Sequence, residues 1–424
     1  MKLIRVTPGT CISSGLSTRP WEQQAQSIEI DDTPLASGAQ GEISAVARLD
    51  GQHAPDLLVK RFLQGFPPSM HEMMAAVRSN HARYRIADRP ALRALPLFLF
   101  SGTLQGQPVD GYVMRRVTGQ QLSDIFSDVN AFNTYINLPW AQRLELCRQF
   151  VEGMDILYSL HLIHADLNGQ NLLVDMVQTT LTIIDLDGGA VAGTGLTPVT
   201  IGKLEPGWLA PEIMRQLAQT TQRQVIPVGM AVDLWSMACG VHQLLFGLAP
   251  FFFMAQQEDI PAYLARYTWP HLKGLQGLST HNHQAFGYYE RVYAQSPAAI
   301  RRFLAFAFQK GYGDPAQRPT ASQWLQECTA ALTQHGPVSL PPAPPPAPPA
   351  SPGVPSMIAC PACGHDNSPT MLYCQYCAAL LGAERLCPHS ARKRFVLPLP
   401  GLARFGRHWT PETAQYCTVC GERL

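Results

Sequence analysis

The proline-rich stretch from residue 337 to 356 limits the possible folds of this chain more than any other feature. It reads PVSLPPAPPPAPPASPGVPS. Proline lacks a backbone N–H and fixes φ, so this stretch cannot join a helix or the interior of a sheet. Its composition predicts an extended spacer of about 3.1 Å per residue, or alternatively a docking segment for a proline-binding module. The chain therefore divides into a large globular part, a linker at 336–358 and a small tail at 359–424.

Composition and charge exclude few functions. The 424 residues are 46% hydrophobic and 15% charged, which is typical of a chain with a sizeable buried core. The net charge of +1 argues neither for nor against a nucleic-acid or membrane partner. The first residues, MKLIRVTPGTCISS, lack a long apolar segment, and no uncharged apolar run reaches about 18 residues. We therefore expect a cytoplasmic protein that does not span a membrane.

The globular part changes from strands to helices along its length, which predicts an α+β fold. Residues 26–115 contain short strand-like runs and one helix, PSMHEMMAAVRSNHARYRI, with apolar residues at helical spacing. From about residue 139 helices dominate, and WAQRLELCRQFVEGMDILYSLHLI carries one apolar stripe, made of Leu144, Cys147, Val151, Met154 and Leu157. Residues 1–25 form an N-terminal extension whose role the sequence leaves open.

The segment IHADLNGQN carries the strongest chemical signal. Asp166 precedes Asn171 by five residues in a polar loop, and Asp185 ends the apolar strand in IIDLDG. Carboxylate and amide oxygens suit Mg²⁺, which prefers hard oxygen ligands and substrate phosphates. An EF-hand calcium loop is the alternative, but the glycine of this loop is misplaced and the final glutamate is missing.

Two earlier features fit the same chemistry. Gly38 and Gly41 lie between two predicted strands, where glycines let backbone N–H groups approach phosphates. Taken alone, this pattern favours a plain hairpin turn. Lys60 follows in the apolar run LLVK, where its side chain either extends to solvent or pairs with a buried anion.

Taken together, residues 35 to 320 resemble the protein-kinase domain. Seven motifs occur in the order of that family: LASGAQGEI, LLVK, HADLNGQN, DLD, LAPE, DLWSMACG and GDPAQRPTA. The resemblance implies a bilobal fold, with a β-rich N-lobe at 26–115 and an α-rich C-lobe at 116–335. It also implies that Arg318 pairs with Glu212 and that the helix containing DLWSMACG anchors the catalytic loop.

The resemblance implies a role for each matching residue. Asp166 accepts or orients the substrate hydroxyl, and Asn171 and Asp185 hold Mg²⁺ against the phosphates of ATP. Lys60 holds two phosphates and pairs with a helix glutamate, for which Glu72 is the candidate. The residues expected around the nucleotide are Gly38, Gly41, Ile43, Leu58, Lys60, the gatekeeper Met114, Val117 at the end of the hinge, and Leu173.

Three substitutions in and after the predicted catalytic loop depart from the family pattern. Ala165 replaces an arginine that commonly meets an activation-segment phosphate, so control by phosphorylation of this segment is not expected to use that contact. Asn168 replaces a lysine that contacts the transferred phosphate, which removes a positive charge near the transition state. Asp187 replaces the glycine of the DFG motif and is a candidate for an additional Mg²⁺ ligand.

The loop pattern is similar to that of a divergent bacterial branch of eukaryotic-like kinases. Some members of that branch accompany a metal-dependent protein phosphatase and a von Willebrand factor A-type protein, and they phosphorylate the latter. The resemblance therefore suggests these two proteins as partners.

The tail contains seven of the 11 cysteines. Two CxxC pairs, which are Cys360 with Cys363 and Cys374 with Cys377, predict a zinc ribbon. A second zinc site is predicted from Cys387, Cys417 and Cys420, with His389 as the first choice of fourth ligand and His408 as the second. A single ribbon with free cysteines is the alternative. The tail is locally basic, but protein docking is favoured over nucleic-acid binding.

The sequence thus predicts a Ser/Thr protein kinase that uses ATP, Mg²⁺ and Zn²⁺, whose tail recruits a substrate or regulator. A pseudokinase that binds nucleotide without transfer is the alternative. A tail that docks on nucleic acid, with a secondary kinase domain, is a third reading. The choice of Ser/Thr over Tyr is not settled, because Asn168 is atypical of both classes.

Overall fold

The computed structural model of the chain describes most of the globular part and four short segments of the tail. The described residues are 1–17, 19, 24–38, 41–67, 69–191, 197–200, 208–218, 225–252, 260–270, 280–335, 358–359, 366–367, 384–386 and 409–411. They belong to two compact units. The first contains residues 1–123, 138–250 and 297–343, and the second contains 124–137, 251–296 and 344–424.

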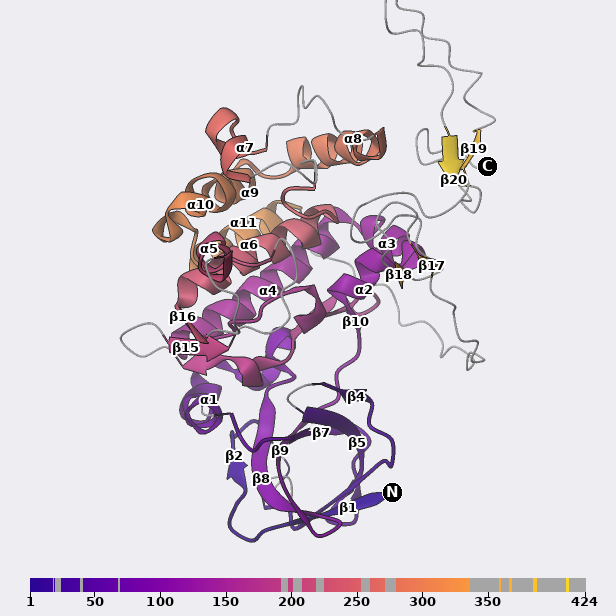
Figure 1. Cartoon of the computed structure of the whole chain (residues 1–424), viewed down its shortest axis with the longest axis vertical. Coiled ribbons are helices and arrows are strands. Elements are labelled where there is room, and N and C mark those ends of the chain that lie inside the picture. Colours follow the sequence, from indigo (N-terminus) through magenta and orange to yellow (C-terminus); the bar gives the residue numbers. More distant parts are fainter. Residues whose placement is uncertain are drawn as a thin grey trace, which may run out of the picture. The chain divides into compact units, whose positions relative to one another are not determined.

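The first unit begins with an antiparallel sheet that closes on itself. Its order is β1-β3-β5-β7-β9-β8-β2, and β1 also pairs with β8, so the strands curve around a common core (Figure 1). The strands are β1 (Lys2–Val6), β2 (Ile12–Ser13), β3 (Ser27–Ile30), β4 (Ala36–Ser37), β5 (Gly41–Leu49), β6 (Gln52–His53), β7 (Leu57–Phe62), β8 (Pro96–Leu104) and β9 (Gln107–Arg115). Ile4, Ile28, Val59 and Val113 are fully buried.

The N-terminal extension supplies the strand that closes this sheet. β1 pairs with β3 along its length and with β8 from Ile4 to Val6. At Gly102 of β8, a Cβ atom would lie 2.3 Å from the carbonyl oxygen of Arg5. Glycine is therefore required at this point, because only a bare Cα lets the two backbones approach so closely.

One helix accompanies the sheet. α1 (Met70–Tyr84) buries Met70, Met73, Met74 and Val77, which confirms the helical stripe predicted from the sequence. Two 3₁₀ turns, η2 (Ile86–Asp88) and η3 (Pro90–Leu92), lead from α1 towards β8.

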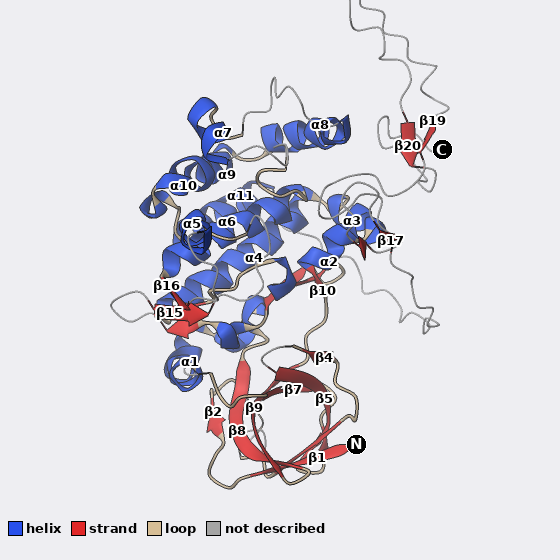
Figure 2. Cartoon of the chain, viewed as in Figure 1, coloured by secondary structure: helices blue, strands red, loops and turns tan. Residues whose placement is uncertain are grey.

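The rest of the first unit is mainly helical (Figure 2). Helices α6 and α11 pack against α4, whose predicted stripe from Leu144 to Leu157 is fully buried. The helices are α4 (Trp140–Ser159), α5 (Pro211–Ala218), α6 (Met230–Phe246), α9 (Ala298–Ala305), the π-helix η6 (Phe306–Lys310), α10 (Gly311–Gly313), the 3₁₀ turn η7 (Pro315–Gln317) and α11 (Ala321–His335).

Three small antiparallel sheets and two 3₁₀ turns complete the first unit. Strand β12 pairs with β10 and β13, β11 with β14, and β15 with β16. Their bounds are β10 (Gln120–Gln121), β11 (Leu162–Ile163), η4 (Gly169–Asn171), β12 (Leu172–Asp175), β13 (Thr180–Ile183), η5 (Leu186–Gly188), β14 (Ala190–Val191), β15 (Thr197–Thr200) and β16 (Val225–Val228). Helix α2 (Leu122–Ser127) begins in the first unit and ends in the second.

The second unit contains α3 (Val129–Ile136), α7 (Ile260–Arg266) and α8 (Thr280–Gln295), with Tyr263, Trp269 and Tyr289 buried. In the tail, the structure describes two strand pairs, which are β17 (Ile358–Ala359) with β18 (Asp366–Asn367) and β19 (Glu384–Leu386) with β20 (Trp409–Pro411). All the predicted zinc ligands lie outside the described residues, and so does nearly all of the proline-rich linker. No helix within the described ranges is long and apolar enough to cross a bilayer.

A buried ion pair joins α5 to the turn before α11. The guanidinium of Arg318 donates to both carboxylate oxygens of Glu212, at 2.7 and 2.6 Å. Arg318 also donates to the carbonyl oxygens of Gly311 and Ala231 at 2.9 and 2.6 Å, and its side chain is fully buried. The pair that the sequence predicted is therefore present.

Closure of the N-terminal sheet generates the first prediction. We expect Gly102→Ala to lower the free energy of unfolding by about 1–3 kcal/mol, because the new methyl group meets a backbone oxygen that no side chain can move aside. Urea denaturation measures this change. Gly313→Ala is the control, since its Cβ meets nothing within 4 Å and its stability should stay unchanged or rise slightly. Equal stabilities of the two variants would contradict the required close approach.

The buried ion pair generates the second. Glu212→Ala should lower the free energy of unfolding by about 3–5 kcal/mol, because it leaves the Arg318 charge buried and without its carboxylate. Asp88→Ala breaks an ion pair with Arg85 whose side chains are 58% and 72% exposed, and should cost less than about 1 kcal/mol. Comparable losses in both variants would show that burial does not determine the strength of the Arg318 pair.

Candidate active site

One buried carboxylate anchors the loop that contains Asp166. Asp233, in the first turn of α6, accepts hydrogen bonds from the backbone N–H of His164 at 2.6 Å and of Ala165 at 2.9 Å. Ala165 has a φ of 64°, in the left-handed region that alanine rarely adopts. The imidazole Nε2 of His164 lies 2.9 Å from the carbonyl oxygen of Ile184, which ties the loop to the end of β13. The chain thus enters the loop in a fixed, strained conformation.

Two amide side chains then hold Asp166. Asn171 donates from Nδ2 to the carbonyl oxygen of Asp166 at 2.7 Å. Asn168 donates to a carboxylate oxygen of Asp166 at 3.2 Å, while its own Oδ1 accepts from the N–H of Gln170 at 2.8 Å. Burial raises the pKa of Asp166, which is half-buried in this loop. The carboxylate is therefore oriented by a neutral neighbour.

Lys60 of β7 meets two carboxylates of the segment after β13. Its Nζ lies 2.5 Å from Asp185 and 2.8 Å from Asp187. The side chain of Asp185 is 42% exposed, whereas those of Lys60 and Asp187 are 7% and 0% exposed. Burial alone lowers the pKa of Lys60, but the two carboxylates outweigh it and raise that pKa above its usual value. The structure therefore brings together three of the residues predicted to handle phosphates and metal.

The structure does not place Glu72, the predicted partner of Lys60, beside that lysine. Glu72 is exposed on α1 and has no ion-pair or hydrogen-bond partner among the described residues. The physical reason is the helical phase: Met70, Met73 and Met74 face the core, which turns Glu72 outward. Asp187 occupies the position beside Lys60 instead, although the sequence assigned it to the metal.

Two contributing residues were not predicted. The hydroxyl of Tyr112 donates to Asp187 at 3.2 Å, and the Ser69 hydroxyl, just before α1, donates to the carbonyl oxygen of Gly189 at 2.8 Å. Tyr112 is the β9 partner of Lys60 in the β7–β9 register, which places both side chains on one face. The sequence alone does not show this contact, because it depends on the register in which β7 and β9 pair.

Most of the residues predicted around the nucleotide lie on the neighbouring strands β5, β7 and β9 and on β12, whereas Gly38 follows β4 and Val117 follows β9. Ile43 pairs with Lys60 across β5 and β7, and Leu58 pairs with Met114 across β7 and β9. Ile43, Leu58 and Leu173 are partly exposed, whereas Met114 is buried. A Cβ at Gly41 would lie 2.2 Å from the carbonyl oxygen of Arg61, so strand packing already requires that glycine. A Cβ at Gly38 would meet nothing within 4 Å.

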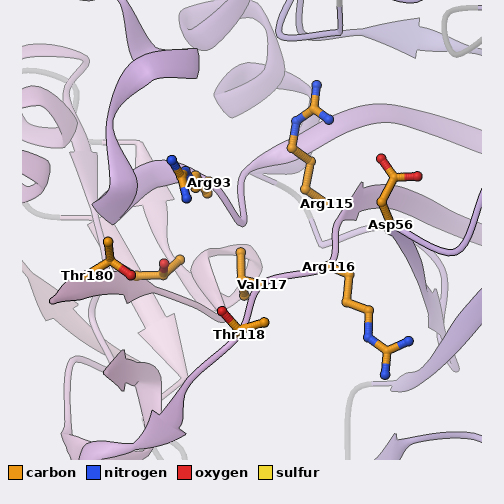
Figure 3. A pocket seen from close by; sticks show the side chains of 8 residues that line it. Asp56, Arg93, Arg115, Arg116, Val117, Thr118 and Thr180 are labelled. Carbon is orange, nitrogen blue, oxygen red and sulfur yellow. The ribbon is translucent and has the colours of Figure 1, made fainter. Parts of the chain in front are cut away.

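A polar pocket lies at the hinge (Figure 3). It measures about 290 Å³ and is lined by Asp56, Arg93, Arg115, Arg116, Val117, Thr118, Thr180 and Thr182. Of the residues predicted around the nucleotide, only Val117 lines it. Its three arginines do not suit the neutral, largely apolar ring of adenine. This pocket is therefore distinct from the predicted adenine site.

The donor set near Asp185 is compatible with Mg²⁺. Because Nδ2 of Asn171 is engaged by Asp166, its Oδ1 remains as the acceptor atom of the side chain. An exposed carboxylate and an amide oxygen suit an ion that keeps several waters and binds substrate phosphates. Across the described ranges, no three histidine, cysteine, aspartate or glutamate side chains are grouped to hold a metal by themselves.

Comparison with known proteins supports the resemblance of this chain to the protein-kinase domain. The family model of the protein kinase domain matches residues 111–328, just over half of the chain. The match includes the Asp166 loop and Asp185, whereas Gly38, Lys60 and Glu72 lie before it.

Curated relatives match shorter stretches. Mitogen-activated protein kinase kinase kinase 6 of Homo sapiens is 33% identical over 107 residues, which are 24% of this chain and 8% of that protein. Mitogen-activated protein kinase kinase kinase 5 of Arabidopsis thaliana is 27% identical over 179 residues, 42% of this chain and 21% of the relative. Calcium/calmodulin-dependent protein kinase type 1 of Macrobrachium nipponense is 28% identical over 142 residues, 33% of this chain and 36% of the relative.

The matches to these relatives thus span at most 36% of their lengths. The motif order, the loop held by Asp233 and the family match agree. The chain belongs to the protein kinase family.

Proposed function

We propose that this protein transfers the γ-phosphoryl group of ATP to a Ser or Thr hydroxyl of a protein substrate. The observation that carries the proposal is the loop from His164 to Asn171, in which Asp233 fixes the backbone and two amides hold Asp166. Phosphoryl transfer depends mainly on positioning and on electrostatic stabilisation, and such a loop supplies the first.

Each group has a defined task in this proposal. The carboxylate of Asp166 accepts a hydrogen bond from the substrate hydroxyl, orients it and receives its proton. The ammonium of Lys60 contacts the phosphates and offsets their charge. Asp185 and Asn171 provide the oxygen ligands for Mg²⁺, and when bound this ion neutralises charge on the transferred group.

The nucleotide is proposed to lie along β5, β7 and β9. Ile43, Leu58 and Leu173 are the proposed apolar contacts of the adenine ring, with Met114 behind it and Val117 at the hinge. The partial exposure of the first three supports this role, because a side chain that covers a bound ring is open to solvent without it. Gly38 is the proposed backbone contact to the phosphates. Its Cβ position is open, so packing within the protein does not explain this glycine.

A pseudokinase is the second candidate, and a specific contact favours it. Asn168 is neutral, and both ends of its amide are engaged within the loop, so it adds no charge near the transferred group. A nucleotide-binding scaffold tolerates such a loss, whereas an enzyme loses rate.

The tail completes the proposal. We propose that Cys360, Cys363, Cys374 and Cys377 bind one zinc ion. Cys387, His389, Cys417 and Cys420 are proposed to bind a second. The tail then recruits a substrate or regulator at the end of the proline-rich spacer. A bacterial origin, a von Willebrand factor A-type substrate and a phosphatase partner are proposed from the loop pattern alone.

The proposed transfer can be tested with labelled ATP and Mg²⁺. Asp166→Ala and Asp185→Ala should each reduce phosphate incorporation into the protein or an added substrate by about 100-fold or more, because each removes a group that orients a reactant or the metal. Asp88→Ala, a carboxylate on the protein surface, should retain wild-type incorporation. Equal incorporation by all four proteins would sink the proposal. Stabilisation by ATP without incorporation would favour the pseudokinase.

Metal analysis of the purified chain tests the tail. We expect about two zinc ions per chain, since two sets of four ligands suit tetrahedral zinc. Cys360→Ser with Cys363→Ser should remove one ion, and Cys417→Ser with Cys420→Ser should remove the other. Cys11→Ser is the control, because this cysteine lies in the described N-terminal region without a cysteine partner and should leave the zinc content unchanged. A zinc content near zero in the wild type would refute both ribbons.

A further inference from the structure

Asp187 lies in η5, in the segment after β13, and its buried side chain contacts strands β7 and β9 of the N-terminal sheet. One carboxylate oxygen, Oδ1, accepts from Nζ of Lys60 at 2.8 Å and from the hydroxyl of Tyr112 at 3.2 Å. Its other oxygen, Oδ2, is buried without a hydrogen-bond partner in the described part of the chain. The side chain has no exposed surface. The carboxylate of Asp187 therefore contacts other protein groups and is not accessible to a ligand from solvent.

The two carboxylates beside Lys60 differ in access. Asp185 is 42% exposed, so a hydrated ion can reach its carboxylate, whereas Asp187 is closed to solvent. Mg²⁺ gives up its waters reluctantly and is bound in sites that keep several of them. Exposure therefore suits Asp185 to the metal and excludes Asp187 from the same task in this geometry.

The charge of Lys60 requires a permanent partner. An ammonium group that is 7% exposed is destabilising unless a carboxylate stays close to it. When Asp185 turns to a metal, it can no longer be the main partner of Lys60. Asp187 remains, because Tyr112 and Lys60 both hold its Oδ1. Glu72 faces solvent on the outer side of α1 and does not make this contact.

We propose that Asp187, held by Tyr112, is the positioning residue that keeps Lys60 directed at the nucleotide phosphates. It takes the task that the sequence assigned to Glu72, and it is not a third metal ligand. This inference rests on the proposed function, since it concerns the nucleotide site of that reaction.

Labelling of Lys60 by an acyl-phosphate derivative of ATP measures this positioning directly. In the reaction Lys60 first loses a proton to solvent and its neutral Nζ attacks the acyl carbon. An amide bond forms, the bond between the acyl carbon and the phosphate oxygen breaks, and the nucleotide leaves with its phosphates. Loss of the Asp187 charge favours this proton loss, so slower labelling in Asp187→Asn reports a lost position of Lys60 relative to the bound phosphates. We expect Asp187→Asn to slow the labelling of Lys60 by about tenfold or more, as the loss of a charged hydrogen bond predicts. Glu72→Gln changes charge by the same amount and should slow it by less than about twofold. The reverse order would overturn the inference.

A second variant separates the loss of this contact from a loss of the folded structure. Tyr112→Phe keeps the packing of the ring but removes the hydroxyl that holds Asp187, and should slow labelling by about two- to tenfold, the range of one neutral hydrogen bond. Thermal unfolding of each variant, measured without nucleotide, shows whether it is folded. A folded Asp187→Asn protein and a folded Tyr112→Phe protein that both label at the wild-type rate would refute the positioning role.

The magnesium dependence separates positioning from metal binding. If Asp187 positions Lys60, the Mg²⁺ concentration for half-maximal transfer should stay within about twofold of wild type in Asp187→Asn, while the maximal rate falls. A shift of tenfold or more to higher Mg²⁺, with unchanged Lys60 labelling, would make Asp187 a metal ligand. Labelling without phosphoryl transfer in the wild type would refute the proposed function and leave this inference standing. Absence of ATP-competed labelling in the wild type would refute both.

Discussion

The loop that contains Asp166 depends on the carboxylate of Asp233. Its two oxygens take the backbone N–H groups of His164 and Ala165, and so hold Ala165 at a positive φ. For an alanine this conformation costs about 1–2 kcal/mol, so it persists only where other contacts impose it. The position of Asp166 follows from that imposed turn. The two hydrogen bonds also stabilise the buried carboxylate of Asp233, because they replace hydrogen bonds to water that it lost on burial.

Lys60 links this loop region to the N-terminal sheet. One ammonium group on β7 faces Asp185 and Asp187, so the strand and the segment after β13 are joined by a buried cluster with more acid than base. The Lys60 charge and burial act in opposite directions on each carboxylate. The pKa of Asp185 is lowered, since the nearby Lys60 outweighs its burial, whereas burial dominates at Asp187 and raises its pKa. The different exposure of the two carboxylates, 42% at Asp185 and 0% at Asp187, fits the different tasks proposed for them.

Sequence patterns predicted the features that depend on local periodicity or on an ordered set of motifs. The buried stripes of α1 and α4 were correct because the 3.6-residue period decides which side chains face the core. The predicted Lys60–Glu72 contact is not seen in the structure for the same reason, since that period turns Glu72 outward. The contacts of Tyr112 with Asp187 and of β1 with β8 depend on strand register, which no local pattern specifies. Gly41 and Gly102 are likewise explained by backbone contacts between strands that are distant in sequence.

The substitutions at Ala165 and Asn168 act on different properties of the site. Ala165 keeps the backbone geometry, because Asp233 holds its N–H, but its methyl group cannot bind a phosphate. The loop is therefore set by the fold itself rather than by an arginine contact to a modified residue. Asn168 keeps a contact to Asp166 but brings no charge. In the proposed reaction, the positive charge that offsets the negative charge of the transferred group must then come from Lys60 and the metal. The accurate placement of Lys60 is therefore more important here than in a kinase whose loop carries a lysine.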